Sequence, residues 1–144
     1  MGLTGAFSRA QTELMHCLRA LPETSSFQVV LYNRTAEFLT GNRSLSASSE
    51  SIAVIDRLLK ESVPEGATDH VKAVSVALSL EPDAIFLVTD ADDLTPLQVR
   101  ELTRLNRARA SLHTIDVSRR LRAASMLERL AQSNGGRHVR AIGR

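Results

Sequence analysis

The chain has 144 residues, 43% of them apolar and 24% charged, so it is long enough to bury one sizeable core and has the composition of an ordinary globular domain. Its only cysteine, Cys17, excludes an internal disulfide and any cysteine-based zinc site. No apolar run approaches the ~20 residues of a membrane-spanning helix, and the amino terminus lacks a signal-peptide layout, so as written the chain is predicted to be cytoplasmic.

The net charge of +2 conceals an uneven distribution along the chain. Residues 1–99 carry 7 Lys and Arg against 13 Asp and Glu, whereas residues 100–144 carry 11 Arg against 3 acidic residues. An arginine-rich segment can bind nucleic acid, but single-strand binders also place aromatic side chains among the basic ones, and this segment has none. We therefore interpret the arginines as solvated helix faces and expect no nucleic-acid partner.

Helical spacing of apolar residues alternates with short β-branched runs along the whole chain. The predicted elements are, in order, a helix over 4–21, a strand over 27–32, a short antiparallel edge strand over 36–39, a loop over 41–51, a helix over 52–59, a helix from 66–70 to 80, a strand over 84–89, a helix over 95–107, a strand over 112–117, a helix over 123–132 and a strand over 137–142. This alternation predicts a single α/β domain over 1–144, with a doubly wound, mostly parallel sheet and helices on both faces.

The run Ala84-Ile-Phe-Leu-Val-Thr-Asp90 is the most informative stretch of the sequence. Five consecutive apolar residues without alternation are typical of a central parallel strand covered on both sides. Sites in such sheets lie beyond the carboxyl ends of the strands, where Asp90 follows. We assign Asp90 to a site, and Asp92, Asp93 and Thr95 mainly to capping of the helix that begins near Pro96.

Five segments of the chain together resemble a von Willebrand factor type A (VWA) domain, and the similarity covers nearly the whole sequence. The segments are Phe27-Gln-Val-Val-Leu-Tyr-Asn33, Gly66-Ala-Thr68, Ala84-Ile-Phe-Leu-Val-Thr-Asp90, His113-Thr-Ile-Asp-Val117 and Leu130-Ala-Gln-Ser-Asn-Gly-Gly136. The resemblance implies a doubly wound, Rossmann-like sheet and a metal-ion-dependent adhesion site built from three loops.

The resemblance assigns two metal ligands of that adhesion site to this chain, Thr68 in the second loop and Asp90 in the third. The family usually continues the third-loop Asp with Gly, whereas Ala91 stands here, and the Asp-x-Ser-x-Ser of the first loop does not occur in the 144 residues. Because Mg²⁺ prefers near-octahedral oxygen ligation, Thr68 and Asp90, even with a third oxygen from Asp92, predict weak or no Mg²⁺ affinity. His70 is expected at the rim of this site.

The resemblance further implies that the central strand and its metal-binding loop would lie upstream of Met1, which takes the place of a methionine just after the family motif. Strand 27–32 would then either close onto strand 84–89 or leave an unpaired strand edge. Such an edge invites another strand, so a homodimer through the open edge is a further expectation.

Three functions remain open from the sequence. The first is a VWA-type module that binds a protein partner and is not an enzyme; the second is a structural remnant or fragment of a larger protein without its own activity. The third is a small hydrolase that pairs His113 or His70 with Asp116 or Asp90, although no Gly-x-Ser-x-Gly motif occurs and His113 and Asp116 would face opposite sides of a strand.

Overall fold

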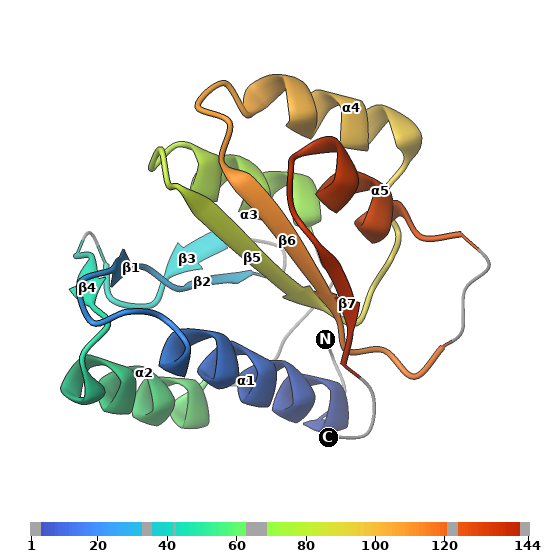
Figure 1. Cartoon of the computed structure of the whole chain (residues 1–144). Helices are drawn as coiled ribbons and strands as arrows, with labels where there is room; N and C mark the ends of the chain where they lie inside the picture. Colours follow the sequence, from blue (N-terminus) through green and yellow to red (C-terminus); the bar gives the residue numbers. More distant parts are fainter. Residues whose placement is uncertain (1–3, 33–35, 42, 63–68, 121–123, 142–144) are drawn as a thin grey trace.

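The computed structural model describes residues 4–32, 36–41, 43–62, 69–120 and 124–141 (Figure 1). Its elements are α1 (Thr4–Arg19), β1 (Ser26–Phe27), β2 (Val30–Tyr32), β3 (Ala36–Phe38), β4 (Leu45–Ser46), α2 (Ser49–Glu61), α3 (His70–Leu78), β5 (Ala84–Thr89), α4 (Pro96–Leu105), β6 (Ser111–Asp116), α5 (Met126–Ser133) and β7 (His138–Arg140). The predicted alternation of helices and strands is confirmed. None of the described helices is both long and apolar enough to cross a membrane.

The strands form three separate sheets within the described residues. β5, β6 and β7 make a parallel sheet in that order, β2 and β3 make an antiparallel hairpin, and β1 pairs antiparallel with β4. The single strand expected over 27–32 is thus two strands, because its halves pair with different partners. The loop expected over 41–51 also proves to contain β4 and the start of α2.

Side-chain caps fix where the helices begin. Thr95 forms a capping box with Gln98 at the start of α4, with Pro96 in the first turn, as the sequence predicts. Ser48 caps α2 by accepting a hydrogen bond from the Ser51 N–H, which extends this helix to Ser49. Asp69 caps α3 in the same way through the Lys72 N–H.

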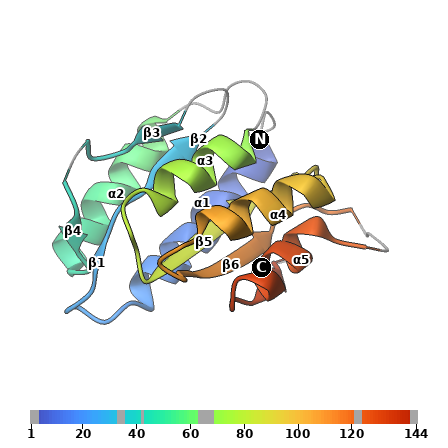
Figure 2. The same ribbon diagram turned by 90° about the horizontal axis from the view of Figure 1, so that it is seen from above.

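Helices cover both faces of the parallel sheet, and this confirms the predicted α/β architecture (Figures 1 and 2). On one face, α3, α4 and α5 pack against β5 and β6 in a core that contains Val74, Leu87, Leu94, Val99, Leu102, Leu112, Leu127 and Leu130. On the other face, α1 covers Ile115 and Val117. α1 also packs with α2 and the short strands in a third cluster around Met15, Leu18, Val29, Ile55 and Leu59.

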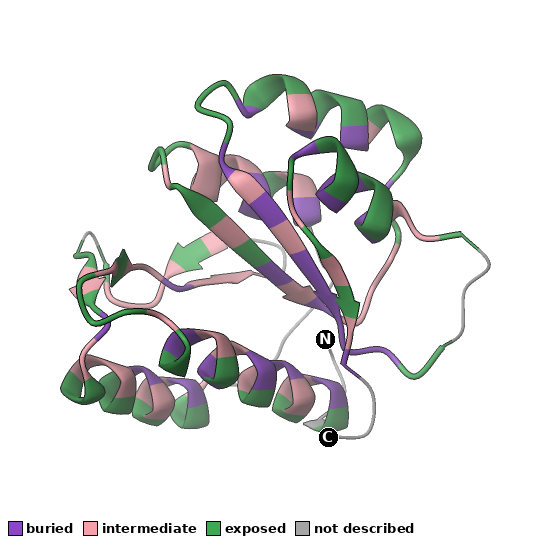
Figure 3. Cartoon of the chain, in the orientation of Figure 1, coloured by how far each residue is buried: buried purple, intermediate pink, exposed green. Residues whose placement is uncertain are grey.

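The two long strands β5 and β6 differ in burial although they are neighbours (Figure 3). In β5 only Leu87 and Thr89 are buried, and Phe86 is 42% exposed. The expectation of a strand covered on both sides is therefore wrong for most of β5. The reason is topological: β5 pairs with β6 at one edge, while β2 belongs to a different sheet, so the described structure leaves the β5 edge open rather than closed onto strand 27–32.

Candidate functional site

Polar residues gather where the parallel strands end, at the carboxyl edge of the sheet. Asp90 follows β5 directly, and the last residue of the neighbouring strand β6 is Asp116, which pairs in register with Thr89. The amino end of α3 reaches the same edge, because His70 contacts Asp93. In open parallel sheets this edge is where ligands bind, so it is the candidate site of the chain.

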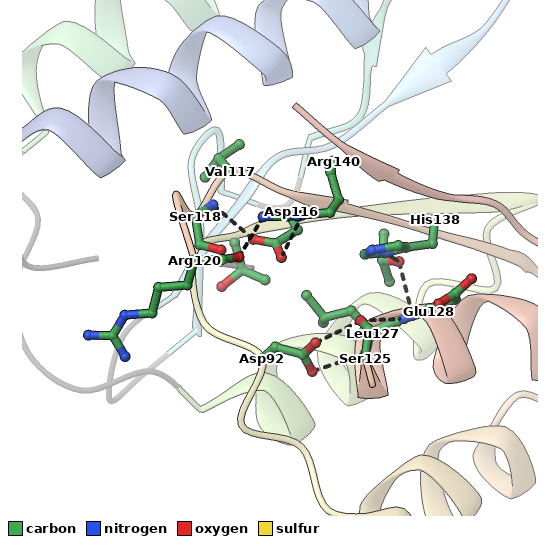
Figure 4. A network of polar contacts seen from close by, with 12 residues as sticks. Asp92, Asp116, Val117, Ser118, Arg120, Ser125, Leu127, Glu128, His138 and Arg140 are labelled. Atoms are coloured by element: carbon green, nitrogen blue, oxygen red, sulfur yellow. Dashed lines mark hydrogen bonds and ion pairs between the residues drawn. The ribbon is translucent and has the colours of Figure 1, made fainter. Parts of the chain in front are cut away.

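Asp92 holds the amino end of α5 from across the sheet edge (Figure 4). Its Oδ1 accepts hydrogen bonds from the backbone N–H groups of Met126 and Leu127 at 3.0 and 3.1 Å, and its Oδ2 accepts one from the Ser125 hydroxyl at 2.7 Å. Ser125 is itself the N-cap of α5. A carboxylate at a helix amino end satisfies otherwise unpaired N–H groups and is favoured by the helix dipole. Asp92 is therefore a capping residue, as expected, but of α5 and not of α4.

His70 is buried and lies between an acidic and a phenolic side chain. Its Nδ1 lies 3.0 Å from the Tyr32 hydroxyl, and its Nε2 lies 2.8 Å from Asp93 Oδ1, a contact that is an ion pair only when the imidazole is protonated. Only 3% of His70 is exposed, which corrects the expectation of a rim residue. Asp93 is the exposed member of the trio, so its role is contact with His70 rather than helix capping.

Burial is the main cause of the pKa shifts of Tyr32 and His70. Loss of hydration raises the pKa of the Tyr32 phenol, and the nearby carboxylates of Asp93 and Asp90 raise it further, while the Thr89 hydroxyl acts in the opposite direction. Burial lowers the pKa of His70 against the opposing attraction of Asp93. Both shifts favour the neutral forms, so Tyr32 and His70 form an uncharged pair behind the acidic residues at this edge.

A second polar cluster, which the sequence interpretation missed, closes the edge at the end of β6 (Figure 4). Asp116 is only 1% exposed; its Oδ1 accepts a 2.8 Å hydrogen bond from the Ser118 N–H, and its Oδ2 lies 3.9 Å from Arg140 Nε. The Arg140 guanidinium also donates to the Arg120 carbonyl. A buried carboxylate beside a guanidinium is a paired charge, and the order Asp116-Val-Ser118 at the carboxyl end of a strand was the available sequence signal.

Of the two predicted metal ligands, the structure describes one. Asp90 is half-buried at the carboxyl edge, and Thr68 lies outside the described residues, so their proximity stays a prediction. In the described part of the chain no three His, Cys, Asp or Glu side chains come together as metal ligands. Asp92, the expected third oxygen, already accepts three hydrogen bonds. The described residues therefore do not fit a Mg²⁺ shell.

The histidine–aspartate pairs of the hydrolase alternative do not form among the described side chains. His113 stacks on Phe86 with ring centroids 4.8 Å apart, and its Nδ1 accepts a hydrogen bond from the Arg137 N–H. Partial burial and the charge of Arg137 lower the pKa of His113. His70 contacts Asp93 instead of Asp90. Each histidine is thus held by a partner other than the one that catalysis would need.

Comparison with known proteins agrees with this fold. The sequence matches the von Willebrand factor type A domain family over residues 5–139, so the chain belongs to that family. Its structure is similar to that of a von Willebrand factor type A protein from Catenulispora acidiphila, with a TM-score of 0.75 and 19% sequence identity. The match covers 96% of this chain and 34% of that one, so this chain spans about a third of the other's length. No curated protein sequence matches this chain.

Proposed function

We propose that this VWA domain is a protein-binding module whose metal-ion-dependent adhesion site is incomplete, so that it binds its partner without Mg²⁺. VWA domains are a family of protein-interaction modules, and the resemblance that places Thr68 and Asp90 in a metal site supplies only part of its ligands. The observation that carries the proposal is the engagement of Asp92, whose two carboxylate oxygens accept three hydrogen bonds from the start of α5.

The cost of recruiting Asp92 to a cation explains the expected weak affinity. Mg²⁺ binds through one or two carboxylates and keeps several waters, and it demands near-octahedral geometry. To serve as a ligand, Asp92 would have to share with the cation the carboxylate oxygens that already hold the first N–H groups of α5. Asp93 is turned toward His70. Thr68 and Asp90 then remain as two protein oxygens for the ion.

Binding is favoured over catalysis because His70 is held inside the fold. Its ring nitrogens contact Tyr32 and Asp93, and the residue is buried, so it is poorly placed to take a proton from a bound substrate. The half-buried Asp90 and the exposed Asp93 place negative charge at the carboxyl edge. This edge would suit a partner with a complementary basic or polar surface.

Two measurements test the proposal. Titration calorimetry of the chain with MgCl₂ should show no submillimolar affinity, and Asp90→Asn should leave the heat signal unchanged; submillimolar binding that Asp90→Asn removes would contradict the proposal. Immobilised chain should then retain the same proteins from a cell extract in MgCl₂ and in EDTA. Loss of those proteins in EDTA would indicate a metal-dependent site, and capture of none under either condition would favour the structural remnant.

A further inference from the structure

A pocket lies between the turn that joins β3 to β4 and the start of α2. Its volume is about 340 Å³, and it is lined by Thr40, Arg43, Leu45, Glu50, Ser51 and Val54. Ligand pockets in proteins range from about 300 to 1,000 Å³, so this one has the size for a small molecule. β4 and the start of α2 lie on the side of the molecule away from α5 (Figures 1 and 2). The pocket is therefore separate from the polar residues of the candidate site, which contact α5.

Two hydrogen bonds fix the turn that forms one wall of this pocket. The Thr40 hydroxyl donates to the Arg43 carbonyl at 2.9 Å, and the Arg43 N–H donates to the Thr40 carbonyl at 3.5 Å. Gly41 has a φ of 62°, which lies in the left-handed region that glycine adopts without strain. The backbone that carries Arg43 is therefore held at the pocket before any ligand binds, and this lowers the cost of ordering on binding.

Two opposite charges line the pocket without pairing with each other. Arg43 and Glu50 are both exposed, and neither forms an ion pair within the described part of the chain. A guanidinium donates several hydrogen bonds to a carboxylate, and a carboxylate accepts them from an ammonium group. The pocket therefore offers one place for a negative group and another for a positive group of the same ligand.

The start of α2 adds a hydrogen-bond donor to the pocket. The Ser48 hydroxyl donates to the Ser51 hydroxyl at 3.1 Å and accepts a hydrogen bond from the Ser51 N–H as the N-cap of the helix. The proton of the Ser51 hydroxyl is thus left for a ligand. This donor lies in the first turn of a helix of 13 residues, where the helix dipole favours negative charge. Ser51 therefore supports Arg43 in holding a carboxylate.

Two aliphatic side chains complete the lining of the pocket. Leu45 of β4 packs against the core that contains Ile55 and Leu59, and Val54 follows Glu50 by one turn of α2 and is 37% exposed. No aromatic side chain lines the pocket, so it has no surface on which a flat ring would stack. A matching ligand carries a carboxylate, an ammonium group and a short aliphatic chain, and this combination is an aliphatic α-amino acid.

We propose that the pocket between the β3–β4 turn and α2 binds a free aliphatic α-amino acid. Arg43 and the Ser51 hydroxyl hold the carboxylate of the amino acid, and Glu50 accepts hydrogen bonds from its ammonium group. Leu45 and Val54 contact its side chain. The inference goes beyond the proposed protein-binding function and uses none of the carboxylates at the carboxyl edge of the sheet, so the two proposals can fail independently.

The probe is L-leucine, and titration calorimetry measures its binding. The unmodified chain should bind it with a dissociation constant of about 1 mM or lower. L-leucinamide lacks the carboxylate and N-acetyl-L-leucine lacks the ammonium group, so each should bind at least about tenfold more weakly through the loss of a charge-assisted hydrogen bond. Absence of L-leucine binding would overturn the proposal. Equal binding of N-acetyl-L-leucine would assign the pocket to a carboxylate alone, such as a peptide carboxyl terminus, and would also overturn it.

Charge-removing variants locate the bound amino acid. Arg43→Gln and Glu50→Gln should each weaken L-leucine binding at least about tenfold. Arg104→Gln and Glu101→Gln are the matched controls, because they remove the same charges from exposed positions of α4 outside the pocket. These controls and Asp90→Asn should bind like the unmodified chain, and urea unfolding checks that every variant is folded. Unchanged binding by Arg43→Gln and Glu50→Gln, or equal weakening by the controls, would contradict the proposed site.

Discussion

β5 and β6 are adjacent six-residue strands in full parallel register, yet the more polar one is the more buried. β6 contains Thr114 and Asp116 and buries four of its residues, whereas the almost wholly apolar β5 buries two. β6 has strand or loop partners at both edges, because Leu112 and Thr114 also donate to the carbonyls of Asn134 and Arg137. The difference teaches that neighbours, and not hydrophobicity, set the burial of a strand here.

The largest loss of stability is expected from a cavity in β6, and it can be compared directly with a truncation in β5. Leu112 is fully buried, so Leu112→Ala should lower the free energy of unfolding by about 2–5 kcal/mol, because it loses apolar burial and leaves a cavity. Phe86→Ala removes a larger side chain from β5, but one that is 42% exposed and stacked on His113. Its cost should be about 1 kcal/mol. Urea denaturation measures both, and equal losses would mean that β5 is as well covered as β6.

A smaller effect is expected at the carboxyl edge from Asp92. Asp92→Ala should lower the free energy of unfolding by about 1–2 kcal/mol, since the first N–H groups of α5 lose their acceptor. Asp92→Asn keeps one carbonyl oxygen and should lose less. Asp93→Asn is the control, because Asp93 is exposed and does not cap α5. If Asp92→Ala were as stable as the parent chain, the cap would be incidental and the carboxylate would be available to a ligand.

The sequence predicts the features that depend on neighbouring residues and misses the contacts between residues that are far apart in the chain. Local patterns were enough for the helices, for the cap that Thr95 supplies before Pro96, and for the parallel strand ending before Asp90. The partners of Asp92 lie 33 to 35 residues further on, across the sheet edge, and no local pattern marks them. The ion pair of Asp116 with Arg140 depends on the placement of β7.

The sequence predicts the open edge of β5 only as one of two outcomes: strand 27–32 either closes onto strand 84–89 or leaves an unpaired edge. The apolar run of Ala84–Thr89 indicates a strand that could be central, but burial depends on which strand lies beside it, and the sequence does not show how β2 is placed. The split of the segment 27–32 into β1 and β2 has the same origin, since its pairing partners, β4 and β3, are separate strands.

The burial of His70 likewise follows from contacts with Tyr32 and Asp93, 38 and 23 residues away.

The smallest expected effect is the pH dependence of the free energy of unfolding that His70 causes. Because burial lowers the pKa of His70, the unfolded chain takes up a proton at a higher pH than the folded chain does. Stability should therefore be complete above the ordinary histidine pKa of about 6.5 and fall as the pH drops toward the lower folded-state pKa. His70→Gln should flatten this loss in urea titrations at several pH values. His113→Gln should flatten it less, since His113 is less buried; a larger effect of His113→Gln would contradict this assignment.

Amide hydrogen exchange along β5 tests the central claim most directly. The account predicts alternation: the N–H groups of Ile85, Leu87 and Thr89 exchange slowly because they donate to β6, whereas those of Ala84, Phe86 and Val88 exchange rapidly. In β6 the N–H groups of Leu112 and Thr114 should be slow together with those of the intervening residues. Uniform slow exchange along all of β5 would show that its second edge is already paired within the chain, and would contradict the open edge.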